Sequence, residues 1–180
     1  MDDNCLNSIF FITGAESTGK STLTADLAMH FGGIGIPEYA RTYLESLNRH
    51  YEYSDVEVIA RRQIELIYQN RNRPLVFFDT CLINLKVWFR EVYQRIPDWL
   101  EKEIPKAGKG TYLICQPDLP WQYDPLRENP LRRDYLSDQY EQELKAAGFV
   151  YFRVFGIGEK RIQCATEIVN RMRKPEIEQI

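Results

Sequence analysis

Short apolar runs alternate along the chain with longer stretches in which apolar residues recur at helical spacing. Five runs are almost wholly apolar and end at Gly, Pro or polar residues, which is typical of buried strands. They are Ser8–Thr13, Gly33–Pro37, Leu75–Asp79, Thr111–Cys115 and Phe149–Phe155. Because strands separated by helices pair in parallel and bury both faces, the pattern predicts a three-layer α/β fold with a five-stranded parallel sheet.

The intervening segments predict five helices. They are Lys20–Phe31, Ser54–Asn70, Leu82–Arg95, Leu131–Ala147 and Glu159–Met172. Ser54 and Glu57 have the spacing of a capping box at the start of the second helix. Since ligands of such folds bind beyond the carboxyl ends of the parallel strands, the residues that follow each strand are the candidates for chemistry.

The segment after the first strand matches the phosphate-loop pattern G-x-x-x-x-G-K-S/T, between a strand and a helix. The candidate nucleotide-binding residues are Gly14, Ala15, Glu16, Ser17, Thr18, Gly19, Lys20, Ser21 and Thr22. The two glycines allow the backbone to curl, so that its amides and those of the following helix point at phosphate oxygens. Lys20 is expected to bridge the β- and γ-phosphates of ATP, and the Ser21 hydroxyl to bind Mg²⁺.

Two acidic residues follow the second and third strands. Asp79 ends an apolar strand, as the metal-binding acid of a Walker B motif does, although Asp is also a common turn residue. Glu38 is placed to accept a proton from a substrate hydroxyl, and Arg41 to bind substrate or phosphate. The alternative for Glu38 is a surface acid paired with Arg41. The sequence leaves open which of the two acids is the base.

An arginine-rich segment follows the fourth strand, at about residues 117–134. Its four prolines argue against a continuous helix, and Arg127, Arg132 and Arg133 fall within seven residues. A mobile lid with these arginines would neutralise phosphate charge and exclude water, with Arg127 as the expected catalytic residue. The alternative is a solvated basic loop. Trp121 and Tyr123 are interpreted as anchors of the lid rather than stacking rings.

The region between the second and third strands forms the acceptor pocket in P-loop kinases. We expect Tyr39, Gln63 and Tyr68 to be candidates for contact with an acceptor ring. With eleven tyrosines in the chain, simple packing is an equal alternative for each of them.

Composition narrows the classes of partner. A net charge of −3 and a pI near 5.5 do not favour nucleic acid or an anionic membrane. No apolar run is long enough to cross a bilayer, and the acidic N-terminus is unlike a secretory signal. The four cysteines, Cys5, Cys81, Cys115 and Cys164, form no C-x-x-C pair. These observations predict a cytoplasmic protein with reduced thiols and no structural zinc site.

Several strings occur in a characteristic order: ITGAESTGKSTL, PEYAR, YSD with a downstream Arg-Gln, FFDT, and D-x-P-W-x-x-D-x-x-R. Together they resemble the ribosylnicotinamide kinase domain of NadR-type proteins. The resemblance implies a nucleoside-kinase-like P-loop fold and phosphorylation of the 5′-hydroxyl of nicotinamide riboside by Mg·ATP, a step of NAD synthesis. It implies that Glu38 and Arg41 meet the ribose, that Asp79 meets the metal or hydroxyl, and that Tyr68 lies near the nicotinamide ring.

The chain departs from the family pattern at two positions on the acceptor side. Pro37 replaces an aromatic residue before the glutamate, and Cys81 replaces a second acid. With thirteen residues before Gly14, neither the DNA-binding nor the adenylyltransferase domain of longer family proteins is expected here. We expect one P-loop kinase domain over residues 1–180.

Two other functions remain open. One is a kinase for another nucleoside, nucleotide or vitamin acceptor. The other is a regulatory ATP-binding module with no acceptor chemistry. A GTPase is disfavoured because no N-K-x-D guanine motif occurs.

Overall fold

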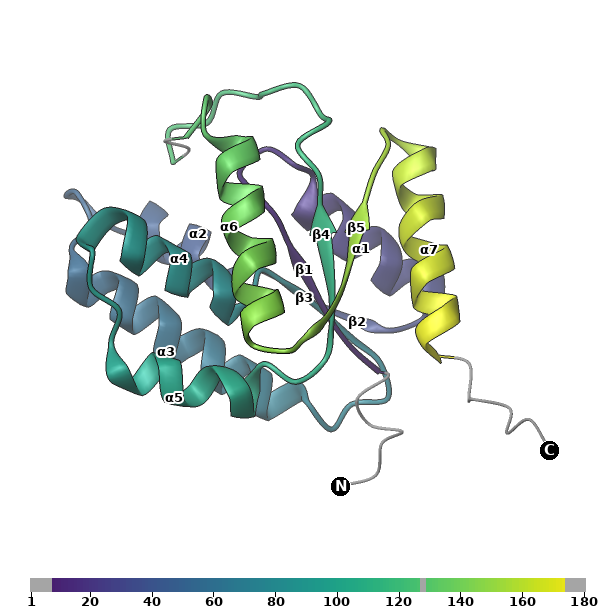
Figure 1. Cartoon of the computed structure of the whole chain (residues 1–180), viewed down its shortest axis with the longest axis horizontal. Helices are drawn as coiled ribbons and strands as arrows, with labels where there is room; N and C mark the ends of the chain where they lie inside the picture. Colours follow the sequence, from purple (N-terminus) through teal and green to yellow (C-terminus); the bar gives the residue numbers. More distant parts are fainter. Residues whose placement is uncertain (1–7, 127–128, 174–180) are drawn as a thin grey trace.

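Five parallel strands form one sheet, as predicted, and their order in the sheet is β2-β3-β1-β4-β5 (Figure 1). The strands are β1 (Ile9–Thr13), β2 (Ile34–Ile36), β3 (Val76–Asp79), β4 (Thr111–Cys115) and β5 (Val150–Val154). The structure is a computed structural model and describes residues 8–126 and 129–173. Each strand lies within a predicted apolar run, so the pattern of apolar residues in the sequence was sufficient to locate it.

The central strands β1, β3 and β4 are buried at every residue because both of their faces are covered. Successive residues point to opposite faces, and the register pairs Phe10 with Phe77 and Phe11 with Phe78. The first pair stacks at 5.4 Å between ring centroids on one face, and the second at 5.2 Å on the other. Each face of the sheet therefore carries a stacked aromatic pair that packs under the helices on that face.

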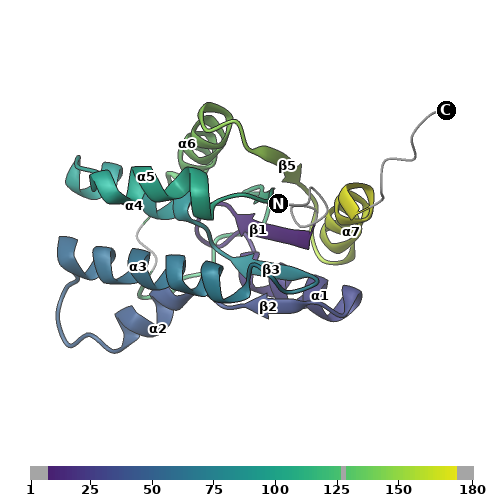
Figure 2. The ribbon, with the colours of Figure 1, turned by 90° about the horizontal axis from the view of Figure 1, so that it is seen from below.

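Two layers of helices enclose the sheet (Figures 1 and 2). Helices α1 (Lys20–Phe31) and α7 (Glu159–Arg173) pack on one face, through residues such as Leu27 and Val169. The other face is covered by α3 (Tyr53–Asn70), α4 (Leu82–Tyr93), α5 (Asp98–Ala107) and α6 (Arg133–Ala146). The short helix α2 (Tyr39–Glu45) packs beside α3.

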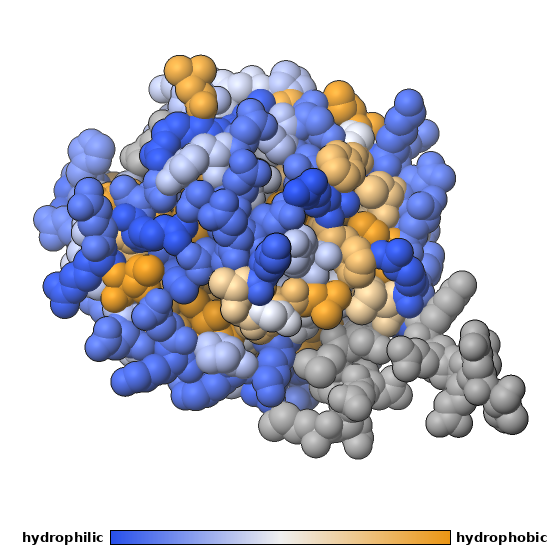
Figure 3. All heavy atoms as spheres, in the orientation of Figure 1, coloured by the Kyte–Doolittle hydropathy of each residue, from blue (hydrophilic) through white to orange (hydrophobic). Residues whose placement is uncertain are grey.

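The outer strand β5 is less covered than the centre of the sheet. Val150 is 49% exposed and Phe155, just after the strand, is 52% exposed. Apolar residues gather near β5 and α7 on this face (Figure 3).

The predicted capping box of α3 was wrong. The helix begins two residues earlier, with Glu52 as N-cap and Asp55 in the third helical position. The Asp55 carboxylate accepts from the Glu52 amide at 2.7 Å and also binds Arg49 and Tyr43. Because these two partners lie in the preceding loop and in α2, tertiary contacts select this register over the Ser54–Glu57 alternative.

Two helices were not predicted. Helix α2 has only seven residues, too few for a clear apolar period. Helix α5 has Pro97 as its N-cap, contains Pro105 and ends at Gly108. Prolines and glycine are strong breaker signals, but Pro97 lies outside the helix and Pro105 only in its last turn. Packing of Leu100 and Ile104 into the core stabilises α5.

Candidate active site

The phosphate loop has a backbone that only particular residues tolerate. Gly14 has φ +139° and Gly19 has φ +77°. A Cβ atom at Gly14 would lie 2.6 Å from the Cys115 carbonyl oxygen, so this position excludes any larger residue. Ser17, with φ +56°, also adopts the left-handed region. The loop is thus curled around a small space in front of α1, as an anion-binding loop requires.

Lys20 and Thr18 both bind the same carbonyl group inside the loop. Lys20 Nζ donates to the Ala15 oxygen at 2.9 Å, and Thr18 Oγ1 donates to it at 2.8 Å. The N-cap of α1 is Gly19, which has no side chain to cap the first amides of the helix. These amides and the Lys20 ammonium group are the groups that attract a phosphate.

Asp79 and Ser21 form the part of the site that fits Mg²⁺. Asp79 is only 3% exposed, and the Ser21 side chain lies close enough to its carboxylate to affect the pKa of Asp79. Its Oδ1 atom has no hydrogen-bond partner within residues 8–126 and 129–173. Burial, followed by the nearby Glu38 charge, raises the pKa of Asp79 against the opposing effects of Ser21 and Lys20. A buried carboxylate oxygen in need of a partner, beside a serine hydroxyl, is a suitable ligand set for a hard cation that also binds phosphate.

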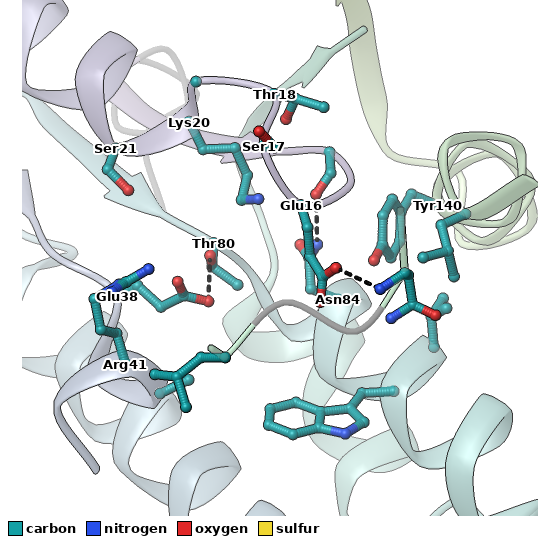
Figure 4. A pocket seen from close by; sticks show the side chains of 18 of the residues that line it. Glu16, Ser17, Thr18, Lys20, Ser21, Glu38, Arg41, Thr80, Asn84 and Tyr140 are labelled. Carbon is teal, nitrogen blue, oxygen red and sulfur yellow. Dashed lines mark hydrogen bonds between the residues drawn. The ribbon is translucent and has the colours of Figure 1, made fainter. Parts of the chain in front are cut away.

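Glu38 lies on the other side of the phosphate loop and lines the cavity. Thr80 Oγ1 donates to Glu38 Oε1 at 3.0 Å (Figure 4). Thr80 has φ +76°, which is rare for a β-branched residue and costs conformational energy. Glu38 is the N-cap of α2, but its side chain caps no amide there. Figure 4 shows Glu38, Lys20 and Ser21 around one space.

Arg41 lines the same cavity but is not paired with Glu38. It binds Asp124 at 2.5 Å and Glu45 at 3.2 Å. Because Asp124 lies in the segment after β4, this ion pair joins α2 to the predicted lid across the cavity opening.

One cavity of about 850 Å³ connects the phosphate loop with a pocket between α2, α4 and α6. Its lining includes every phosphate-loop residue from Gly14 to Thr22 except the buried Ala15. The far end is formed by residues that the sequence did not suggest, among them Leu44, Tyr51, Asn84, Leu85, Trp88 and Tyr140. Tyr51 and Trp88 meet edge to face at 5.1 Å, and the Trp88 indole donates to the Tyr51 hydroxyl at 3.4 Å.

Asn84 joins the two ends of this cavity. Its Oδ1 accepts from Thr13 Oγ1 at 2.6 Å and from Cys81 Sγ at 3.0 Å, and its Nδ2 donates to the Gly14 oxygen at 3.4 Å. Asn84 also lies near Tyr140, whose pKa is raised by burial. The sequence offered one signal for Asn84, which is a polar residue in the otherwise apolar start of α4, five residues after Asp79.

Three of the predicted acceptor residues lie elsewhere. The Tyr68 hydroxyl donates to Glu103 on α5 at 2.9 Å, outside the cavity. Tyr39 packs against the core beside Tyr43 and does not line the cavity either. Gln63 is buried, and its amide donates to the Thr80 oxygen at 3.4 Å. Gln63 therefore supports the strained residue next to Glu38 rather than facing a ligand.

Residues 116–126 and 129–132 are not helical and lie against the phosphate loop. Arg133 donates to the carbonyl oxygens of Ser17 at 3.3 Å and Leu119 at 2.8 Å. The Asn129 amide donates to Glu16 at 2.9 Å. Arg132 binds Glu91 on α4. Arg127, the predicted catalytic arginine, lies outside the described residues, so its role remains a prediction.

A further arginine, Arg161 on α7, was not identified from the sequence. It is 4% exposed and lies behind the phosphate loop. Its guanidinium group donates to the carbonyl oxygens of Gly156 at 2.8 Å, Thr18 at 2.9 Å and Gln116 at 3.0 Å, and it binds the carboxylate of Asp118. A buried arginine that donates to four acceptors holds the segments that carry these acceptors in a fixed arrangement.

Within the described part of the chain, no helix combines the length and apolar character needed to cross a membrane. Residues 9–161 match the family model described as an AAA domain. The chain belongs to this family. Its match covers the phosphate loop and Asp79, and extends to Arg161.

Similarity to NadR confirms the resemblance seen in the motifs. Over 125 residues the chain is 28% identical to the trifunctional NAD biosynthesis/regulator protein NadR of Salmonella typhimurium. This match covers 64% of the chain but only 30% of that protein. The chain thus corresponds to a part of its multifunctional relative.

Solved structures support the same fold. A NadR protein in complex with NAD and AMP-PNP superimposes with a TM-score of 0.72 at 22% identity, over 97% of this chain and 52% of that chain. Deoxyadenosine kinase from M. mycoides, with products dCMP and dCDP bound, gives 0.64 at 14% identity, over 91% and 99%. Thymidylate kinase from Ehrlichia chaffeensis gives 0.63 at 12%, over 91% and 97%. The fold is that of P-loop nucleoside and nucleotide kinases.

Proposed function

We propose that this protein transfers the γ-phosphate of ATP to the 5′-hydroxyl of a small nucleoside, and that nicotinamide riboside is this acceptor. One observation carries the proposal. A single cavity has the phosphate loop at one end, where Ser21 lies beside the buried Asp79. It has a pocket with two aromatic rings at the other end, and Glu38 in its lining.

The phosphate end supplies the electrostatics of transfer. Lys20 would exchange its bond to the Ala15 carbonyl for oxygens of the β- and γ-phosphates. Ser21 and Asp79 would hold Mg²⁺, which supplies positive charge to the phosphate oxygens when bound. The amides at the start of α1 add a preorganised field that needs no rearrangement during the reaction.

Glu38 is assigned as the base. It lines the cavity and is oriented by Thr80, whereas Asp79 is buried near Ser21 and does not line the cavity. A carboxylate within hydrogen-bond reach of the acceptor hydroxyl can orient it and take its proton as the bond to phosphorus forms. This division leaves Asp79 for the metal.

The acceptor end suits a flat ring. The rings of Tyr51 and Trp88 and the side chains of Leu44 and Leu85 provide apolar surface, and Asn84 provides an amide. A pyridinium ring carries a positive charge, which aromatic faces attract more strongly than they attract a neutral base. A NadR structure similar to this one was solved in complex with NR, which is consistent with this choice.

The departure from the family pattern at Cys81 has little bearing on the ring pocket. Cys81 is fully buried, its thiol donates to Asn84, and burial raises its pKa to about 11. It therefore acts as a small neutral residue beneath the cavity and offers no charge to the acceptor.

The test is a steady-state assay with Mg·ATP and a panel of nicotinamide riboside, deoxyadenosine, cytidine and thymidine, with the phosphorylated product identified by mass spectrometry. We expect acceptor-dependent ADP formation that is fastest with nicotinamide riboside. Fastest transfer to another nucleoside of the panel would show that the proposed acceptor is wrong and that the proposed kinase activity is right. ATP binding without turnover on any acceptor would instead indicate a regulatory ATP-binding module.

A further inference from the structure

We infer that Arg161 is a positioning residue for the nucleotide, which aims backbone amides into the cavity without touching the ligand. The inference extends the proposed function, on which it rests for the identity of the ligand. Arg161 does not line the cavity itself, but it binds the carbonyl oxygens of Thr18, which does, and of Gly156, which precedes the lining residue Ile157.

Peptide bonds in the loops around Arg161 are planar and trans. In such a bond the C=O of one residue and the N–H of the next point in opposite directions. Arg161 holds the Thr18 carbonyl outward at 2.9 Å, which directs the Gly19 amide toward the phosphate space. It holds the Gly156 carbonyl at 2.8 Å, which directs the Ile157 amide away from Arg161. Gly19 and Ile157 both line the cavity.

A second contact fixes the arginine itself. Asp118, at the start of the predicted lid, accepts from Arg161 and also from the Gly156 amide at 2.7 Å. The Arg161 guanidinium also binds the Gln116 carbonyl, directly after β4. Arg161 thus joins the phosphate loop, the first residues of the lid segment and the loop before α7. A lysine cannot reproduce this arrangement, because its single ammonium group lacks the planar fork.

The experiment compares three variants by calorimetry with Mg·ATP and by assay. Arg161→Lys tests the fork. Asp118→Asn weakens the contact of the Arg161 guanidinium with its partly exposed partner and keeps the buried arginine. It serves as the test if Arg161→Lys fails to fold. Arg153→Lys is the matched control, since Arg153 on β5 is half-exposed and binds Glu141. We expect the Kd for Mg·ATP to rise about tenfold in Arg161→Lys and about threefold in Asp118→Asn, as for one weakened charged hydrogen bond. The KM of the acceptor should change little.

A readout specific to positioning is the ¹H–¹⁵N signal of Gly19. It should shift on addition of Mg·ATP in the wild type and in Arg153→Lys, and shift less in Arg161→Lys and Asp118→Asn. Equal ATP affinity and an equal Gly19 shift in Asp118→Asn and wild type would overturn the inference. Failure of the wild type itself to bind Mg·ATP would instead reject the proposed function.

Discussion

The hydroxyl of Thr80 donates a 3.0 Å hydrogen bond to Glu38, and so joins the end of β3 to the start of α2. The two residues are far apart in the sequence, and Thr80 holds a left-handed backbone conformation at this contact. Strain of this kind persists where surrounding structure enforces it, and here Gln63 binds the Thr80 carbonyl. The contact fixes the carboxylate that we assign as the base.

Replacing Thr80 should therefore reduce turnover more than binding. We expect Thr80→Val to lower kcat about tenfold, because Glu38 loses its donor and its orientation. The KM values of both substrates should change little, as measured by steady-state kinetics. Thr80→Ser keeps the hydroxyl and serves as the control; similar losses in both variants would contradict a role for this hydrogen bond.

Lys20 is the clearest test of the phosphate loop. Lys20→Ala should lower kcat by about a hundredfold or more, since it removes a charge that stabilises the transferring phosphoryl group. The exposed Lys109→Ala is a matched control with the same loss of charge outside the cavity. Near-normal turnover of Lys20→Ala in the coupled assay would refute the assigned role.

Asp79 should show opposite effects on activity and stability. Burial raises its pKa, so the carboxylate contributes less to stability once the pH rises through this raised value. Asp79→Asn removes the buried charge, and without Mg²⁺ we expect it to raise Tm at pH 8. Well below pH 3.8, where Asp is protonated in both the folded and unfolded states, the part of this difference that arises from ionisation should vanish.

The same variant should lose metal-dependent activity. We expect kcat to fall by about a hundredfold and the Mg²⁺ concentration for half-maximal rate to rise, because Asn is a weaker ligand than Asp for a hard cation. A Mg²⁺ titration of initial rates provides the measurement. An unchanged Mg²⁺ dependence would show that the metal is held elsewhere.

Trp88 should determine acceptor affinity. Trp88→Ala is expected to raise the acceptor KM roughly 10- to 100-fold, the effect of losing one ring that stacks on a base. The KM of ATP should stay within about twofold of the wild-type value. Trp99, whose indole binds Glu57 and which lies under the Arg61 guanidinium outside the cavity, offers the control Trp99→Ala. Equal acceptor KM values for wild type and Trp88→Ala would exclude this ring from the acceptor site.

The Asp55 network should be important for stability. Asp55→Ala removes the capping of α3 and the bonds to Arg49 and Tyr43, and should lower the free energy of unfolding by about 2 kcal/mol. The pKa of Asp55 is strongly lowered, first of all by Arg49, so this contribution should persist above pH 3.8 and decline as the pH falls below it. Urea unfolding at pH 7 and pH 3 would check both statements.

Local sequence was sufficient for the sheet, for the phosphate loop and for the positions of Asp79 and Glu38. The strands are coded by contiguous apolar residues, and the loop by glycines whose backbone angles other residues do not tolerate. Parallel pairing then brings the ends of β1 and β3 together, because the register sets Ile12 beside Asp79.

Only tertiary packing determined which residues line the proposed acceptor pocket and which residues support the phosphate loop from behind. Tyr68 and Gln63 were plausible from composition, but the packing of α3 turns one toward α5 and the other beneath Thr80. Trp88 and Arg161 carry no local signal, since their partners come from segments distant in sequence. A motif specifies the conformation of its own backbone, whereas the lining of a cavity depends on how separate helices pack together.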